Sequence, residues 1–427
     1  MNPTCPAVVS LILTVAASAL VAQEPASAPA SRRQPAGHAD FGLPRPDAVW
    51  APYHADPAHL LNRLFRAFYL VHAAPAEVAA ALPREHGDAA DFFVPGWYFG
   101  KRAGEATDER WFGGDGRQMP REGFTAAEAA ALREDLAAVD GEVVTALQAT
   151  PRLAVWFQHD LLRMARRLLD TRQNPELLPL LVGAARRVAL SRAVLESDAL
   201  STFRLADVQA RQPELQVARM VELERRSTRL FDAEYVQLWS SVYLAVPETA
   251  ASGLAPWLTP KGKGEKLASV PIGTQAVLVQ GIVALDDEGN ACATDVVIEV
   301  RTQVLRNRDP LAADNATTTR DGVDFAIWSL ERQTLRERGA ATSLADFRTV
   351  DMESQELFRD YGTRKHTTYA AQCTLCHRRS NGPEEELAGF PVLRSHVSPR
   401  PVADPQERRR KAEAEFEKFL AALAKTN

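Results

Sequence analysis

The residues best suited to chemistry lie near the end of the chain, where Cys373, Cys376 and His377 form a Cys-x-x-Cys-His run. Two cysteines at this spacing can each form a thioether bond to one vinyl group of haem. The histidine that follows them can then bind the iron from the proximal side. This run is the attachment motif of a c-type haem, so the sequence predicts one covalently bound haem c with its iron.

The second axial position of the iron is less clearly marked. His396 is the only histidine downstream of His377, and no methionine follows Met352. We expect His396 to be the sixth ligand, and ligation by two histidines would lower the reduction potential relative to His/Met ligation. His366, Met352 and His159 stay open as alternatives, and so does an iron with a free position.

The same cysteines allow a reading without haem. Cys373 and Cys376 have the spacing of a zinc knuckle, and His366, His377 or His396 could complete a tetrahedral site. A Cys pair that binds nothing, or that forms a disulfide, is a further alternative. The chain has no second Cys pair, and a histidine directly after the second cysteine is typical of haem attachment.

The start of the chain resembles an export signal. Residues 6–22 form an apolar run with small residues at its end, although residues 1–5 carry no Lys or Arg. We expect residues 1–22 to be a signal peptide and the protein to be periplasmic or otherwise extracytoplasmic. An uncleaved segment would leave an N-terminal anchor, and no other segment is apolar enough to span a membrane.

Composition limits the classes of partner. The formal net charge is −5, and no basic stripe with interleaved aromatic residues is present, so nucleic acid is not an expected partner. Cys292 stands alone in a predicted strand or turn and is expected to be an inert, small residue. No phosphate-binding glycine loop or hydrolase motif occurs, so the sequence predicts neither a hydrolase nor a nucleotide enzyme.

Most of the first half of the chain is expected to be helical. Residues 23–50 are rich in Ala, Pro and Ser and predict a disordered linker, and residues 51–253 predict a helical domain. Helix starts are expected at Asp56-Pro57, Thr125, Thr150-Pro151 and Asn174-Pro175, with one or two more helices over 213–245. Within the third of these, His159-Asp160 could form a proton relay or a structural helix contact.

The pattern changes after residue 253. Residues 254–350 predict a small antiparallel sheet with strands over 275–285, 294–305 and 323–327, and residues 286–290 have the chemistry of a hairpin turn. In residues 351–427, a helix is expected to lead to Cys373. A terminal helix is expected after Asp404-Pro405, with Phe416, Phe419, Leu420 and Leu423 buried.

Residues 351–427 resemble a small c-type cytochrome, with the attachment run between two helices. The resemblance implies thioether bonds at Cys373 and Cys376, His377 as proximal ligand, and electron transfer with a redox partner protein. The fold expected for the whole chain is mainly α (α+β), with an N-terminal helical region, a small antiparallel sheet and a cytochrome c-like haem unit. The alternatives are a peroxidase-like haem enzyme or sensor with an open iron site, and a non-haem envelope protein.

Overall fold

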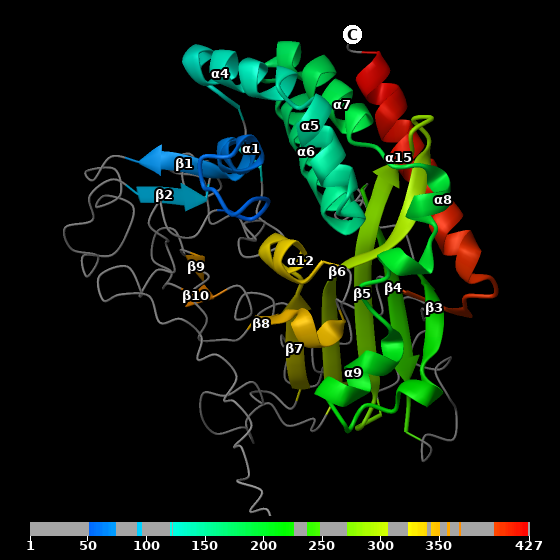
Figure 1. Ribbon diagram of the computed structural model, residues 1–427. Coiled ribbons are helices and arrows are strands. Elements are labelled where there is room, and N and C mark those ends of the chain that lie inside the picture. Colours follow the sequence, from blue (N-terminus) through cyan, green and yellow to red (C-terminus); the bar gives the residue numbers. More distant parts are fainter. Residues whose placement is uncertain are drawn as a thin grey trace, which may run out of the picture.

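The computed structural model describes residues 51–73, 92–95, 120–121, 123–225, 237–247, 271–305, 323–339, 343–350, 357–358, 367–368 and 397–425. These residues form helices and an antiparallel sheet that pack together (Figure 1), so the expected mixed α+β class is confirmed. The predicted signal peptide and linker lie outside the described residues.

Several helices begin where the sequence predicts. The described helices are α1 (Leu60–Tyr69), α4 (Ala126–Ala137), α5 (Gly141–Gln148), α6 (Pro151–Thr171), α7 (Leu178–Arg187), α8 (Arg192–Leu195), α9 (Leu205–Arg211), α12 (Arg332–Arg338) and α15 (Pro405–Ala424), with short 3-10 turns η3 (Pro175–Leu177), η4 (Asp198–Leu200), η5 (Val217–Arg219) and η7 (Leu344–Asp346). Thr125 caps α4 through a capping box with Glu128, and Pro151 is the first residue of α6. The helix expected over 125–147 is two helices, because Asp140 accepts a hydrogen bond from Gly141 N–H and so starts α5.

The described strands are β1 (Leu70–Ala73), β2 (Phe92–Pro95), β3 (Val221–Arg225), β4 (Leu238–Ala245), β5 (Gln275–Leu285), β6 (Ala291–Leu305), β7 (Val323–Ser329), β8 (Arg348–Val350), β9 (Leu357–Phe358), β10 (Thr367–Thr368) and β11 (Val397–Pro401). Seven of them make one antiparallel sheet in the order β11-β3-β4-β5-β6-β7-β8. The three predicted strands and the hairpin turn are confirmed in β5, β6 and β7.

Two expectations about helices are wrong. Residues 221–225 and 238–245 are the strands β3 and β4, where helices were expected. The stretch Leu238–Ala245 has β-branched and aromatic residues, and β4 pairs with β5 along its whole length, so sheet pairing decides its structure. Before Cys373, the described residues 357–358 and 367–368 pair as β9 and β10, where a helix was expected.

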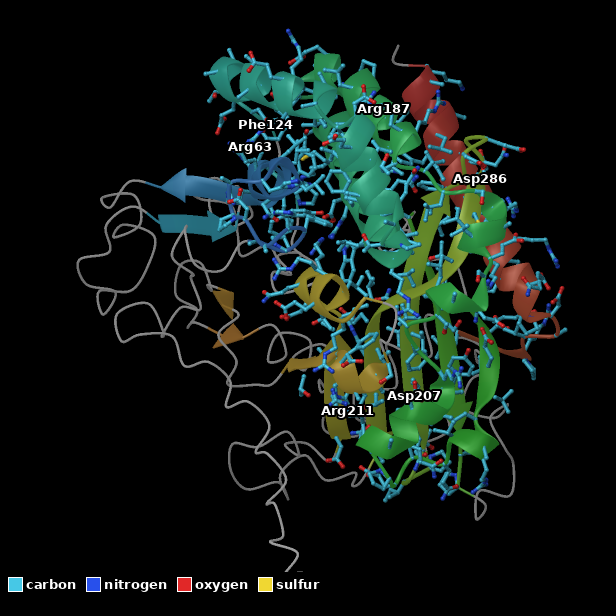
Figure 2. All side chains as sticks on the ribbon, viewed as in Figure 1. Arg63, Phe124, Arg187, Asp207, Arg211 and Asp286 are labelled. Atoms are coloured by element: carbon cyan, nitrogen blue, oxygen red, sulfur yellow. The ribbon has the colours of Figure 1, made fainter. Side chains whose placement is uncertain are left out.

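One hydrophobic core joins the helices to the sheet. Helix α6 lies at its centre, where Trp156, Phe157 and Leu161 are completely buried, and the same cluster contains Val279 and Val300 of the sheet. Figure 2 shows Arg211 of α9 near the lower end of the sheet. The guanidinium of Arg211 lies 6.0 Å from the ring of Trp328 in β7 and donates to the carbonyl of Phe347.

The last helix also belongs to this body. The predicted helix after Asp404 is α15; Phe416, Phe419 and Leu423 are buried, and Leu420 is half-buried. Glu417 and Glu413 accept hydrogen bonds from the backbone N–H groups of Ala291 and Ala293, so α15 is attached to β6. Among the residues described here, no helix combines the length and apolarity needed to cross a bilayer.

The ring of Trp239 in β4 packs directly against the backbone of Gly281 in β5. A Cβ at this position would fall inside the contact distance of the Trp239 ring, whose Nε1 donates to the carbonyl of Thr294. We expect Gly281→Ala to lower the free energy of unfolding by about 1–3 kcal/mol, because the ring must shift. At Gly183 in α7, an added Cβ would make only an ordinary van der Waals contact. Gly183→Ala should therefore raise the free energy of unfolding by up to about 1 kcal/mol, because alanine favours the helix. Urea unfolding of both variants checks this, and equal stabilities would contradict it.

Candidate functional site

The residues of the expected haem site lie outside the described part of the chain. This holds for Cys373, Cys376, His377 and His396, and also for the alternative ligands Met352 and His366. The two strands of the main sheet that flank these residues in the sequence are described: β8 ends at Val350 and β11 begins at Val397. The haem site and its rival zinc site therefore stay predictions. Among the residues that the structure describes, no group of three His, Cys, Asp or Glu side chains could hold a metal ion.

His159 is the one alternative ligand that the structure describes. Its side chain lies in α6 with 2% of its surface exposed, and neither ring nitrogen has a hydrogen-bond partner. Burial, followed by the positive charge of Arg163, lowers the pKa of His159 to about 3, so its imidazole is neutral. A neutral imidazole is the form that binds metals, but a packed core histidine has the same properties.

His159 does not form the proton relay with Asp160 that the sequence allowed. The Asp160 carboxylate is turned toward other partners and has no exposed surface. Arg332 of α12 donates from Nη2 to Oδ1 at 2.6 Å and from Nε to Oδ2 at 2.8 Å. Tyr69 at the end of α1 donates to Oδ1 at 2.7 Å, and Tyr53 donates to Oδ2. Four hydrogen bonds therefore saturate the carboxylate.

Local structure places each member of this buried cluster. Asn62 of α1 holds the turn before the helix, because its side chain accepts from Tyr53 N–H at 2.9 Å and donates to the carbonyls of His54 and Asp56. This turn carries Tyr53 into the core. Arg332 is the first residue of α12, which begins three positions after the end of β7 at Ser329. The cluster therefore joins the N-terminal turn to the three helices α1, α6 and α12.

Aromatic rings surround the Arg332 guanidinium. Its central carbon lies 4.8 Å from the ring centre of Trp156, 5.0 Å from that of Phe65 and 5.4 Å from that of Tyr69. These contacts add cation–π attraction in a place that water does not reach. Together with the hydrogen bonds, they offset the cost of burying two charges.

The electrostatics keep every member of the cluster in one protonation state. Burial lowers the pKa of Arg332, but the charge of Asp160 and the neighbouring tyrosines outweigh it, and the net pKa is raised. Burial, reinforced by the charge of Asp160, raises the pKa of Tyr53 and of Tyr69 well above the ordinary value, so both hydroxyls stay protonated as donors. A carboxylate with all its acceptor sites in use has no role as an acid or base, so we interpret the cluster as structural.

Sequence reasoning missed this cluster, although a trace of it was visible. Asp160 is a charged residue between the apolar pairs Trp156-Phe157 and Leu161-Leu162, and such a residue needs a buried partner. Its partner Arg332 is 172 positions away, so nothing local identifies it. Cys292 is the inert residue that was expected: it is buried in β6, and burial raises the pKa of its thiol to about 12.

The chain gives no match to any family model, to any curated protein or to any solved structure. The interpretation of its function therefore depends on its own residues.

Breaking the buried pair should be costly. Arg332→Met leaves the Asp160 carboxylate buried without its counter-charge, so we expect the free energy of unfolding to fall by about 3–5 kcal/mol. Lys418→Met removes the exposed pair between Lys418 and Glu415 and should change it by less than about 1 kcal/mol. Chemical denaturation measures both, and a loss below about 1 kcal/mol for Arg332→Met would contradict the structural role.

The burial of His159 predicts a pH dependence. Its pKa of about 3 in the folded chain lies below the unfolded value of about 6.5, so between these values only the unfolded chain binds the proton. The stability that this group contributes is fully present above about pH 6.5. It is lost as the pH is lowered from there toward the folded-state pKa, by up to about 1.4 kcal/mol per pH unit. Unfolding of wild type and His159→Leu at several pH values should show a shallower loss in the variant. Parallel curves would mean that the histidine is not buried in its neutral form.

Proposed function

We propose that this chain is an exported monohaem c-type cytochrome-like protein that transfers electrons through a covalently bound haem. The observation that carries the proposal is the run Cys373-x-x-Cys376-His377. The two thiols would form the thioether bonds, His377 would bind the iron, and His396 would bind the opposite side. When bound, the haem supplies one-electron chemistry, and the protein sets its potential through the axial ligands and the polarity around them.

Two further observations support the proposal. The apolar segment over residues 6–22 is typical of export, and haem c is attached outside the cytoplasm. The buried cluster around Asp160 and Arg332 has every carboxylate acceptor in use. An electron carrier needs only a haem edge near a partner protein, so it requires no further catalytic group.

One observation favours a second candidate. No methionine follows Met352, so the usual sixth ligand of a small cytochrome is missing from its usual place. If His396 is not a ligand, the iron keeps an open position and the protein is a haem enzyme or sensor. Carbon monoxide distinguishes the two, because it binds reduced iron only where a position is free. We expect no change in the spectrum of the reduced protein on addition of carbon monoxide.

The attachment site is tested by export of the full chain in a host that attaches haem c. A pyridine haemochrome spectrum should show one covalent haem per chain in the wild type and none in the double variant Cys373→Ala, Cys376→Ala. The control Cys292→Ala removes the buried cysteine of β6 and should keep its haem. A wild-type chain without haem would sink the proposal and leave a zinc-binding or structural envelope protein. A stable haem adduct in the double variant would show that the attachment site is wrong.

A further inference from the structure

The N-terminal turn, residues 51–59, brings two histidines together. Figure 1 shows this turn in blue beside α1 and close to α12. The rings of His54 and His59 stack on one another, with 4.0 Å between their centres and 21° between their planes. His54 is exposed and His59 is half-buried, so both rings can exchange protons with the solvent.

Each histidine accepts a backbone hydrogen bond through Nδ1. The Nδ1 atom of His54 accepts from the N–H of Asp56 at 3.1 Å, and that of His59 accepts from the N–H of Leu61 at 3.3 Å. A ring nitrogen that accepts a hydrogen bond carries no proton, so both imidazoles are neutral in this arrangement, with their proton on Nε2. A proton added at Nδ1 turns each acceptor into a donor that faces another donor. Protonation therefore removes both hydrogen bonds.

His59 also caps a helix. It directly precedes Leu60, the first residue of α1, and its Nδ1 binds the N–H of the second helical residue. This is the hydrogen bond that a capping side chain makes at the start of a helix. An imidazolium cannot make it, and it would place a positive charge at the positive end of the helix dipole. Protonation of His59 therefore removes the cap of the helix that carries Tyr69 to Asp160.

Positive charges surround the turn. Three guanidinium groups donate to its carbonyl oxygens: Arg336 of α12 to Ala51, Arg66 of α1 to Pro57 and Arg63 of α1 to Ala58. These contacts fasten the turn while its histidines are neutral. Two imidazolium rings would add two positive charges to this surrounding and would repel one another across the stack.

The nearby carboxylates offset these charges only in part. Asp135 of α4 and Glu337 of α12 are each paired with one of the arginines. Burial and the charge of His54 lower the pKa of His59, and Asp56 on the turn itself raises it by less, so the net pKa is below the ordinary value. The stability that His59 contributes is therefore present above about pH 6.5 and is lost as the pH is lowered from there.

We propose that residues 51–59 are an acid-released latch: protonation of His54 and His59 frees the turn from α1 and opens the buried Asp160–Arg332 pair to water. Tyr53 connects the two events. Its N–H donates to Asn62 of α1 and its hydroxyl donates to Asp160, so both bonds are lost when the turn opens. Because release takes up two protons, the latch opens more steeply with pH than a single histidine would allow.

The latch goes beyond the proposed function and does not depend on it. The groups named above that form and hold it lie on the turn and on the helices α1, α4 and α12. It can therefore be tested with or without haem, and its failure is distinct from a failure to bind haem.

Hydrogen exchange of the full chain, followed by mass spectrometry, tests the latch. It is measured at about pH 7.5 and about pH 5, on either side of the ordinary pKa of histidine. The readout is the protection factor of peptides from residues 51–64, which corrects for the effect of pH on the intrinsic exchange rate. We expect the wild type to lose at least about tenfold in protection there at the lower pH. A peptide from α7 reports how far the whole chain loosens in acid, including the effect of His159.

The matched variant is His54→Asn, His59→Asn. The oxygen of an asparagine side chain can accept the same backbone hydrogen bonds and carries no charge at either pH. Asparagine is also a preferred residue at the start of a helix. Relative to α7, residues 51–64 of this variant should lose less than about twofold in protection, because nothing in the turn then takes up a proton near neutral pH.

Two results would overturn the latch. One is a variant that loses as much protection over residues 51–64 as the wild type. The other is a wild type in which this segment loses no more protection than α7. If the double variant does not fold, His54→Asn and His59→Asn are compared singly, and each should lose less protection than the wild type.

Discussion

The described structure depends on one buried ion pair, between Asp160 and Arg332. Both side chains lie where water does not reach, so each would be strongly destabilising alone. Two tyrosine hydroxyls complete the carboxylate, and three aromatic rings enclose the guanidinium. Because these groups come from the N-terminal turn, α1, α6 and the start of α12 just beyond β7, the pair reinforces the hydrophobic core that packs the helices and the sheet into one body.

The described C-terminal elements, β11 and α15, belong to the same packed body. α15 packs on β6 through Glu413 and Glu417, and its Arg408 bonds Glu222 of β3 and Ser241 of β4 while its guanidinium lies 4.7 Å from the Trp239 ring. β11 pairs with β3. Both elements that follow the attachment run are therefore parts of the sheet domain. The Cys-x-x-Cys-His run lies in the sequence between β8 and β11, two strands of this sheet.

Local patterns predicted much of this fold and failed where distant contacts decide. The capping box at Thr125, Pro151 at the start of α6 and the 286–290 turn are short-range chemistry, and all three are confirmed. The strands β3 and β4 were predicted as helices, because segments as short as Val221–Arg225 and Leu238–Ala245 fit either structure until a partner strand is known. The Asp160–Arg332 pair could not be predicted, because its members are far apart in sequence. The proposed haem site is predicted from the spacing of the Cys-x-x-Cys-His run alone, whereas a sixth ligand would depend on tertiary contacts.

The central claim is that Cys373 and Cys376 hold a haem covalently. The most direct test is the intact mass of the exported wild-type chain against the Cys373→Ala, Cys376→Ala chain. The account predicts that the wild type is heavier by one haem, beyond the small difference made by two sulfur atoms. Equal haem content in the two proteins, or no haem in either, would contradict it.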